Sequence, residues 1–144
     1  MLPPMTAEGA LPPGIHQAPL GEIVAEFGES NPVRREMARR LRQILETTKG
    51  TGELRRAFVW GSFVTAKPEP ADVDLMLVMS TEFRSERCPP SARQVFDGEA
   101  AQRSLGATVL WTREDVPPGL LNAFLEQWQI DRSGQRRGIV EVLL

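Results

Sequence analysis

Two aspartates one residue apart, Asp72 and Asp74, are the residues of this chain whose type and spacing most clearly indicate a functional site. They begin an apolar run at 75–79, and because side chains alternate along a strand, both carboxylates are predicted to lie on one face, roughly 6–7 Å apart. Carboxylates at this spacing repel each other, and they are close enough to share one hard cation or to bind two neighbouring ones. The pair therefore predicts a site for a divalent metal ion and for the phosphates that such an ion carries.

A glycine and a serine, Gly61 and Ser62, form the second part of the candidate site, directly after a predicted strand at 54–60. Since glycine has no Cβ, the backbone at Gly61 could pass close to a ligand phosphate. The N–H and hydroxyl of Ser62 could then donate to phosphate oxygens, more strongly if a helix begins there. The alternative interpretation is a plain turn at Gly61-Ser62 and a pair of aspartates that cap a strand.

Taken in order, these motifs resemble the signature of the nucleotidyltransferase superfamily, the fold of DNA polymerase β. That signature is an apolar residue, Gly, then Gly or Ser, nine to thirteen residues, and Asp-apolar-Asp-apolar. Nine residues separate Ser62 from Asp72 here, and the apolar places hold Trp60, Val73 and Leu75. In size the chain resembles minimal bacterial nucleotidyltransferases, some of which are antitoxins. An uncharacterised bacterial family of that type is also similar in residues 14–16, 61–68 and 131–140.

The resemblance implies a function and a role for each site residue. It implies Mg²⁺-dependent binding of a nucleoside triphosphate and transfer of its nucleotidyl group to a hydroxyl of a protein or small molecule. Asp72 and Asp74 would bind the Mg²⁺, and Gly61 and Ser62 would bind the terminal phosphates. Lys67 would supply positive charge at the phosphates; alternatively it is an exposed loop lysine.

The sequence departs from the superfamily pattern at the third carboxylate, which active members supply from a later strand. The matching segment here, 107–111, contains no acidic residue. Acidic residues do occur before and after that segment, but none at the expected place: Asp97, Glu99, Glu114 and Asp115. The gap favours an alternative function, a catalytically degenerate domain that binds a partner protein such as a cognate toxin.

The elements that must position these residues follow from apolar spacing and turn-forming residues. Helices are predicted at 20–27, from Asn31-Pro32 to about Gly50, at 91–105 and from Pro117-Pro118 to Trp128. Strands are predicted at 54–60, 73–79, 108–111 and 138–144. Helices that alternate with four strands indicate an α/β or α+β fold, with a small mixed sheet and helices mainly on one face. The proline-rich segment 1–19 is predicted to be an extended arm outside this domain of residues 20–144.

Composition narrows the function classes. The chain has 144 residues, enough for one domain with its own core, and a net charge of −2, which argues against bulk nucleic-acid binding. The single cysteine, Cys88, excludes an internal disulfide, and the single histidine, His16, leaves no base for a Ser-His-Asp site. No signal peptide or membrane span is evident, so a cytoplasmic protein is expected.

Two groups of residues admit both a structural and a functional interpretation. Five arginines on one face of the 32–49 helix are expected to face solvent, although they could bind phosphates or an acidic partner: Arg34, Arg35, Arg39, Arg40 and Arg42. The three tryptophans Trp60, Trp111 and Trp128 are expected in the core or at an interface, although one could stack on a nucleobase.

Overall fold

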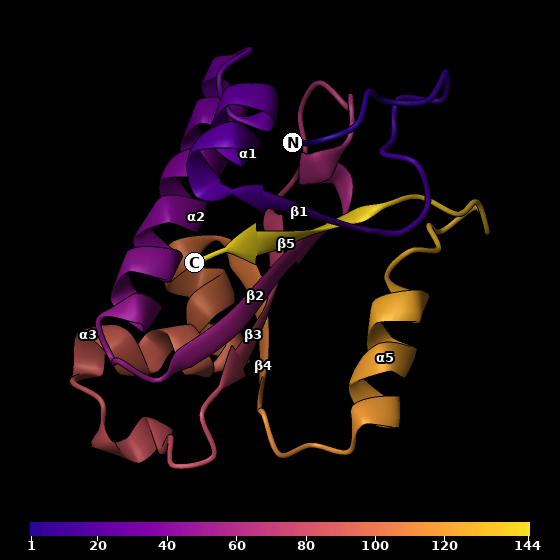
Figure 1. The fold of residues 1–144 in the computed structure, drawn as a ribbon. Coiled ribbons are helices and arrows are strands. Elements are labelled where there is room, and N and C mark those ends of the chain that lie inside the picture. Colours follow the sequence, from indigo (N-terminus) through magenta and orange to yellow (C-terminus); the bar gives the residue numbers. More distant parts are fainter.

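The computed structural model covers residues 1–144 and places five strands in one mixed sheet (Figure 1). The strands lie in the order β1-β5-β2-β3-β4. The central strand β2 is antiparallel to both of its neighbours, whereas β1 is parallel to β5 and β3 is parallel to β4. The bounds are β1 Ile15–Pro19, β2 Leu54–Trp60, β3 Val73–Met79, β4 Ala107–Arg113 and β5 Ile139–Leu143.

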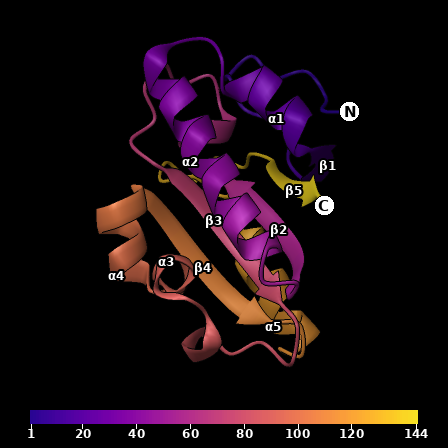
Figure 2. The same ribbon diagram turned by 90° about the vertical axis from the view of Figure 1, so that its left-hand side faces the viewer.

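Most helices cover one face of this sheet, as predicted. Helix α2 crosses β2 and β3, with α1 beside it and the short helices α3 and α4 over β4 (Figure 2). Helix α5 lies alone on the opposite face (Figure 1). The bounds are α1 Leu20–Phe27, α2 Pro32–Lys49, α3 Pro90–Arg93, α4 Gly98–Ala100 and α5 Pro118–Gln127. The predicted α+β architecture is therefore confirmed.

Strand alternation divides the molecule into two apolar cores. The larger core, of 29 buried residues, joins one face of the sheet to α1, α2 and the segments before β4. The smaller core, of seven buried residues, joins the other face to α5. On β3, Val73 and Leu75 belong to the larger core, whereas Met76 and Val78 belong to the smaller one. Asp74 therefore faces the α5 side, away from the main core.

The N-terminal segment differs from the prediction of an arm outside any regular layer. Residues 15–19 form the edge strand β1, which pairs with β5 through registers such as Ile15↔Ile139. Proline is tolerated here because β1 is an edge strand and Pro19 ends it. Leu11 is buried in the main core, and an isolated bridge joins Ala10 to Thr65. The segment thus contributes a fifth strand.

The predicted helix at 91–105 is wrong as a continuous element. It is broken at Asp97, whose backbone is extended and whose carboxylate accepts hydrogen bonds from the N–H groups of Glu99 and Ala100. A side chain that satisfies these donors starts a new helix instead of continuing the old one. The result is the series α3, a turn at Gln94–Phe96, α4 and a π-turn at Ala101–Leu105.

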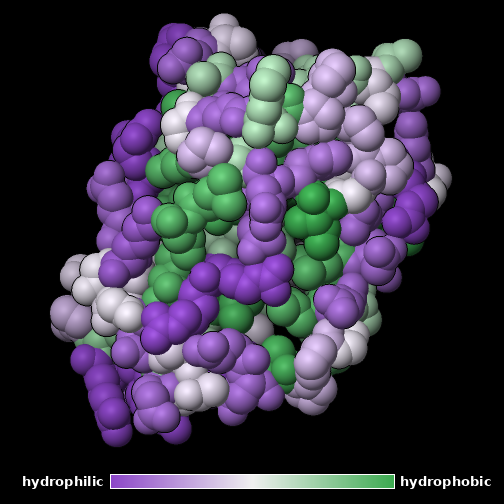
Figure 3. Space-filling view, in the orientation of Figure 1, coloured by the Kyte–Doolittle hydropathy of each residue, from purple (hydrophilic) through white to green (hydrophobic).

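The outer surface is mixed rather than uniformly polar. In the space-filling view, hydrophobic side chains gather in the middle of the molecule, beside the hydrophilic outer surface of α2 (Figure 3). None of the helices combines the length and the apolar composition that crossing a membrane requires.

Candidate functional site

The structure brings Asp72 and Asp74 together on the α5 face, at the beginning of β3. Asp74 pairs in register with Trp60 of β2 and with Thr108 of the neighbouring β4. Both aspartates are half-buried. The hydroxyl of Thr108 donates to Oδ2 of Asp72 at 2.8 Å. Neither aspartate forms an ion pair.

The electrostatics of the pair favour a bound cation. Burial, with the nearby Asp72 carboxylate as the second cause, raises the pKa of Asp74 to about 6. The Thr108 hydroxyl and the guanidinium groups of Arg137 and Arg132 oppose this rise without cancelling it. Near neutral pH, the Asp74 carboxylate is therefore ionised at a cost in free energy. A metal ion beside it would remove that cost.

Gly61 is required here by a contact within the protein that the sequence did not indicate. Its φ of +82° belongs to the region that glycine favours, and a Cβ at this position would collide with Oδ2 of Asp74. The space that a side chain would take holds the carboxylate of Asp74, while the predicted contact of the Gly61 backbone with a ligand phosphate stays a prediction. Gly61 therefore determines where that carboxylate lies, directly over the turn that leads to Ser62.

The loop after Gly61 is shaped by Arg34, which the sequence placed on the solvent face of α2. Arg34 is only 4% exposed. Its guanidinium donates to four backbone carbonyls: Phe27 at 3.0 Å, Phe63 at 2.8 Å, Thr65 at 2.6 Å and Lys67. Burial lowers the pKa of Arg34. The prediction was wrong because a helical pattern cannot show that a distant loop folds over one end of the helix.

Ser62 and Lys67 lie in this loop. Ser62 is half-buried at the start of a single turn, Ser62–Val64, which is too short to provide a helix N-terminus. The Ser62 carbonyl accepts a hydrogen bond of 2.7 Å from the Thr65 hydroxyl. The side chain of Lys67 is exposed, while its carbonyl is one of the acceptors of Arg34. Arg34 thus fixes the backbone of Lys67 and of Phe63, the residue after Ser62.

No third carboxylate joins the pair. Thr108 occupies the place in β4 opposite Asp74. Glu114 lies beyond the far end of β4, roughly 20 Å from the level of Thr108 at strand spacing, where it pairs with Arg55 at 3.4 Å. Asp97 caps α4. The structure contains no group of three or more His, Cys, Asp or Glu side chains that could hold a metal ion.

Arg137, which no sequence motif singled out, lies in the loop before β5. Its Nε is buried and has no hydrogen-bond partner. The loop is held by Asp131, whose carboxylate accepts from the N–H of Ser133 at 2.8 Å and the N–H of Gln135 at 3.0 Å. The only signal in the sequence was the similarity of residues 131–140 to a bacterial family, and it assigned no role to this arginine.

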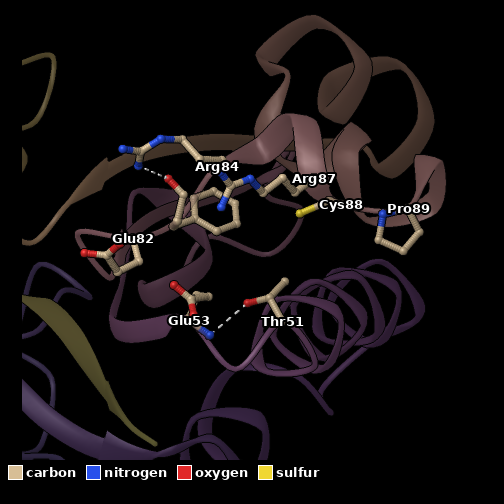
Figure 4. Close-up of a pocket in the computed structure, with 8 residues that line it drawn as sticks. Thr51, Glu53, Glu82, Arg84, Arg87, Cys88 and Pro89 are labelled. Atoms are coloured by element: carbon tan, nitrogen blue, oxygen red, sulfur yellow. Dashed lines mark hydrogen bonds between the residues drawn. The ribbon is translucent and has the colours of Figure 1, made fainter.

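A cavity of about 300 Å³ lies at the opposite end of the sheet, past the end of β3 (Figure 4). It is lined by Thr51, Glu53, Glu82, Phe83, Arg84, Arg87, Cys88 and Pro89. Burial raises the pKa of the Cys88 thiol, which opposes a role as nucleophile. None of the predicted site residues lines this cavity.

A second cavity, of about 260 Å³, lies between the sheet and α5 and is almost entirely apolar. It begins at Met76, two residues after Asp74 on the same strand face. Trp128 forms one wall and stacks on Trp60, with ring centroids 4.1 Å apart and planes 8° apart. An aromatic wall thus extends from the strand beside Asp74 into an apolar groove.

Comparison with known proteins gives a family without a described activity. No curated protein and no solved structure matches the chain. A protein-family model described as a family of unknown function (DUF6932) matches residues 3–143, which include the N-terminal segment that forms β1. Because the match covers nearly the whole chain, the protein belongs to this family.

Proposed function

We propose that the protein is a cytoplasmic enzyme that binds a nucleoside triphosphate with Mg²⁺ at Asp72 and Asp74 and transfers the nucleotidyl group to a hydroxyl. One observation carries this proposal: two half-buried carboxylates lie together beside Gly61, and neither forms an ion pair. Two aspartates fit Mg²⁺, which is commonly bound by one or two carboxylates and completes its shell with substrate phosphates and water. Held by these two residues, such an ion would neutralise negative charge on the triphosphate during nucleotidyl transfer.

The chain's own residues would bind and orient the phosphates. Backbone and hydroxyl donors of Ser62 lie at the turn beside the carboxylates and would contact phosphate oxygens, with the exposed Lys67 adding positive charge. The acceptor oxygen forms a bond to the α-phosphorus, the bond to the β-phosphate oxygen breaks, and pyrophosphate leaves. The hydroxyl proton passes to solvent, because Thr108 stands where a carboxylate base would be needed.

Calorimetric titration with ATP, GTP, CTP and UTP, each with and without Mg²⁺, tests the binding step. We expect tighter binding with Mg²⁺, and we expect Asp74→Asn to remove the metal-dependent part. Glu114→Gln is the control, since Glu114 lies at the far end of β4 in an exposed ion pair. Identical titrations of the wild type and Asp74→Asn would refute the proposal. Transfer of label from an α-labelled triphosphate to a protein or small molecule then tests the chemical step.

A second candidate function is a non-catalytic domain that binds a partner protein, such as a cognate toxin. The missing third carboxylate favours it, and so does an exposed apolar strip beside the α5 groove. The strip comprises Leu110, Leu120 and Phe124, which are 43%, 47% and 45% exposed. Apolar side chains that gather at a groove are typical of protein interfaces.

Co-expression with the product of the neighbouring gene separates the two functions. Phe124→Glu should abolish a complex that uses the groove, whereas Ala123→Glu should retain it. Ala123 is exposed on the same helix and does not line the groove, so it carries the same charge change without touching the proposed interface. Label transfer by the isolated wild-type protein would favour the enzyme instead.

A further inference from the structure

The loop before β5 brings an arginine with an unused buried donor to the candidate site. Nε of Arg137 is a buried side-chain nitrogen without a hydrogen-bond partner, and Arg137 takes part in no ion pair. An unpaired N–H group that is removed from water costs free energy, and native proteins keep few such groups. The terminal nitrogens of the same guanidinium are not buried and donate to no protein group, so an anion can reach them from solvent.

Strand register places Arg137 beside the site. On β2 and β5, Phe58 pairs with Glu141 and Val59 with Val140, so each step along β2 is one step back along β5. Continued to the end of β2, this register sets Ile139 across from Trp60, so Arg137, two residues before Ile139, lies just past the end of β2, where the turn at Ser62 begins. Alternation puts Arg137 on the same face as Ile139, which belongs to the core under α5, and this is the face of Asp74.

The backbone around Arg137 is held firmly. Its N–H donates to the carbonyl of Gln129 at 2.7 Å, and the next N–H, of Gly138, donates to Leu11 at 2.8 Å. Gly138 cannot accept a side chain, since a Cβ there would lie 2.3 Å from the Pro12 carbonyl oxygen. These contacts fix the backbone from which the arginine side chain extends, so the backbone needs no ordering when an anion binds.

We propose that Arg137 is a phosphate-binding residue, which contacts the polyphosphate of a substrate whose metal ion is bound by Asp72 and Asp74. This inference rests on the proposed function. A triphosphate carries more negative charge than one Mg²⁺ neutralises, so a site with two carboxylates needs a further cation. Lys67 and Arg132 are exposed and Arg34 has its donors on carbonyls, which leaves Arg137 as the half-buried cation with free donors at the site. A guanidinium also matches phosphate oxygens with paired donors.

Calorimetry with inorganic tripolyphosphate and Mg²⁺ tests the assignment without a nucleoside. We expect Arg137→Gln to weaken binding about tenfold or more, the usual range for a hydrogen bond to a charged group. Arg136→Gln is the matched control, because the guanidinium of Arg136 is exposed and pairs with Glu126 at 3.0 Å. The affinity of this variant for tripolyphosphate should equal that of the wild type. Arg137→Lys keeps the charge but loses the paired donors of the guanidinium, and it should also bind more weakly than the wild type.

Several results would overturn the inference. It fails if Arg137→Gln or, should that variant not fold, Arg137→Lys binds tripolyphosphate as the wild type does. It also fails if Arg136→Gln loses as much affinity as Arg137→Gln. If Mg²⁺-NTP binds to the wild type and requires Asp74 but is indifferent to Arg137, the proposed function stands and only this inference falls. If neither tripolyphosphate nor any Mg²⁺-NTP binds to the wild type, both fall.

Discussion

Two arginines near the same loop illustrate two uses of a buried guanidinium. Arg34 reaches from α2 into the loop after Gly61 and donates to four carbonyls, among them Phe63 and Thr65. Arg137 approaches from the loop before β5 and leaves its buried Nε without an acceptor. The donors of Arg34 find acceptors within the protein, and they shape the loop. The guanidinium of Arg137 has no acceptor within the protein, and in the proposed function a phosphate accepts from it.

The largest expected effect follows from removing Arg34. Arg34→Met should lower the free energy of unfolding by about 3–5 kcal/mol, because it leaves several inward-facing carbonyls without donors. Arg137→Gln should change it by less than about 1 kcal/mol, because no protein hydrogen bond is lost. Urea denaturation of both variants measures the difference. Equal losses would show that the two arginines do not differ in the way described.

The contrast also shows what the sequence could and could not reveal. Asn31 and Pro32 marked the start of α2 correctly, because capping is local: the Asn31 side chain accepts from the N–H of Arg34 at 2.9 Å. Alternation likewise put Asp72 and Asp74 on one face. Both inferences need only neighbouring residues and the geometry of one element.

The missed features all depend on contacts between distant parts of the chain. Arg34 looked like a solvent-facing residue because the loop that buries it lies about 30 positions later. Strand β1 was hidden in a proline-rich segment because its partner, β5, lies more than 120 positions away. Gly61 was noticed, but no sequence pattern could show that the Asp74 carboxylate fills the space over it. Tertiary packing decided each of these cases.

The next largest effect concerns the turn that separates the two arginines. Gly61→Ala should cost about 2–4 kcal/mol of stability, because it strains a backbone at φ +82° and places a methyl group against the Asp74 carboxylate. Gly52→Ala is the control: Gly52 also has a positive φ, of +73°, but a Cβ there meets nothing within 4 Å. It should cost about 1 kcal/mol.

A double variant isolates the steric part of this loss. Asp74→Ala removes the carboxylate and should recover part of the cost of Gly61→Ala, while it should leave the cost of Gly52→Ala unchanged. Free energies of unfolding of the wild type, the three single variants and the two double variants provide the coupling energies. Additive costs for Gly61 and Asp74 would show that the two residues do not meet as described.

A smaller effect tests whether the site is held at a cost in stability. The pKa of Asp74 is raised from its ordinary value of 3.8 to about 6, so the folded protein binds this proton more tightly than the unfolded chain does. Protonated Asp74 therefore stabilises the folded protein below pH 3.8, and this contribution is lost as the pH rises through the folded-state pKa of about 6. The full shift corresponds to an upper bound of about 3 kcal/mol, which solvent screening of a half-buried group reduces to about 1–2 kcal/mol.

Asp74→Asn should consequently be more stable than the wild type at pH 8 by about 1–2 kcal/mol, and this advantage should vanish near pH 4. Thermal unfolding across this pH range measures it. A variant that is less stable than the wild type at pH 8, by the same margin at every pH, would contradict the idea of a strained carboxylate pair. Added Mg²⁺ should raise the unfolding temperature of the wild type and not that of the variant.

The smallest effect belongs to Thr108, a donor in the same site whose partner, unlike that of Arg137, is already present. Its hydroxyl donates to Asp72 at 2.8 Å and opposes the rise in the pKa of Asp74. Thr108→Val keeps the shape but loses the donor, so we expect a loss of about 1 kcal/mol or less and a further increase in the pKa of Asp74. Thr108→Ser retains the hydroxyl and should leave that pKa where it is. An NMR titration of the Asp74 carboxyl carbon measures all three proteins, and an unchanged pKa in Thr108→Val would mean that this hydroxyl does not act on the pair.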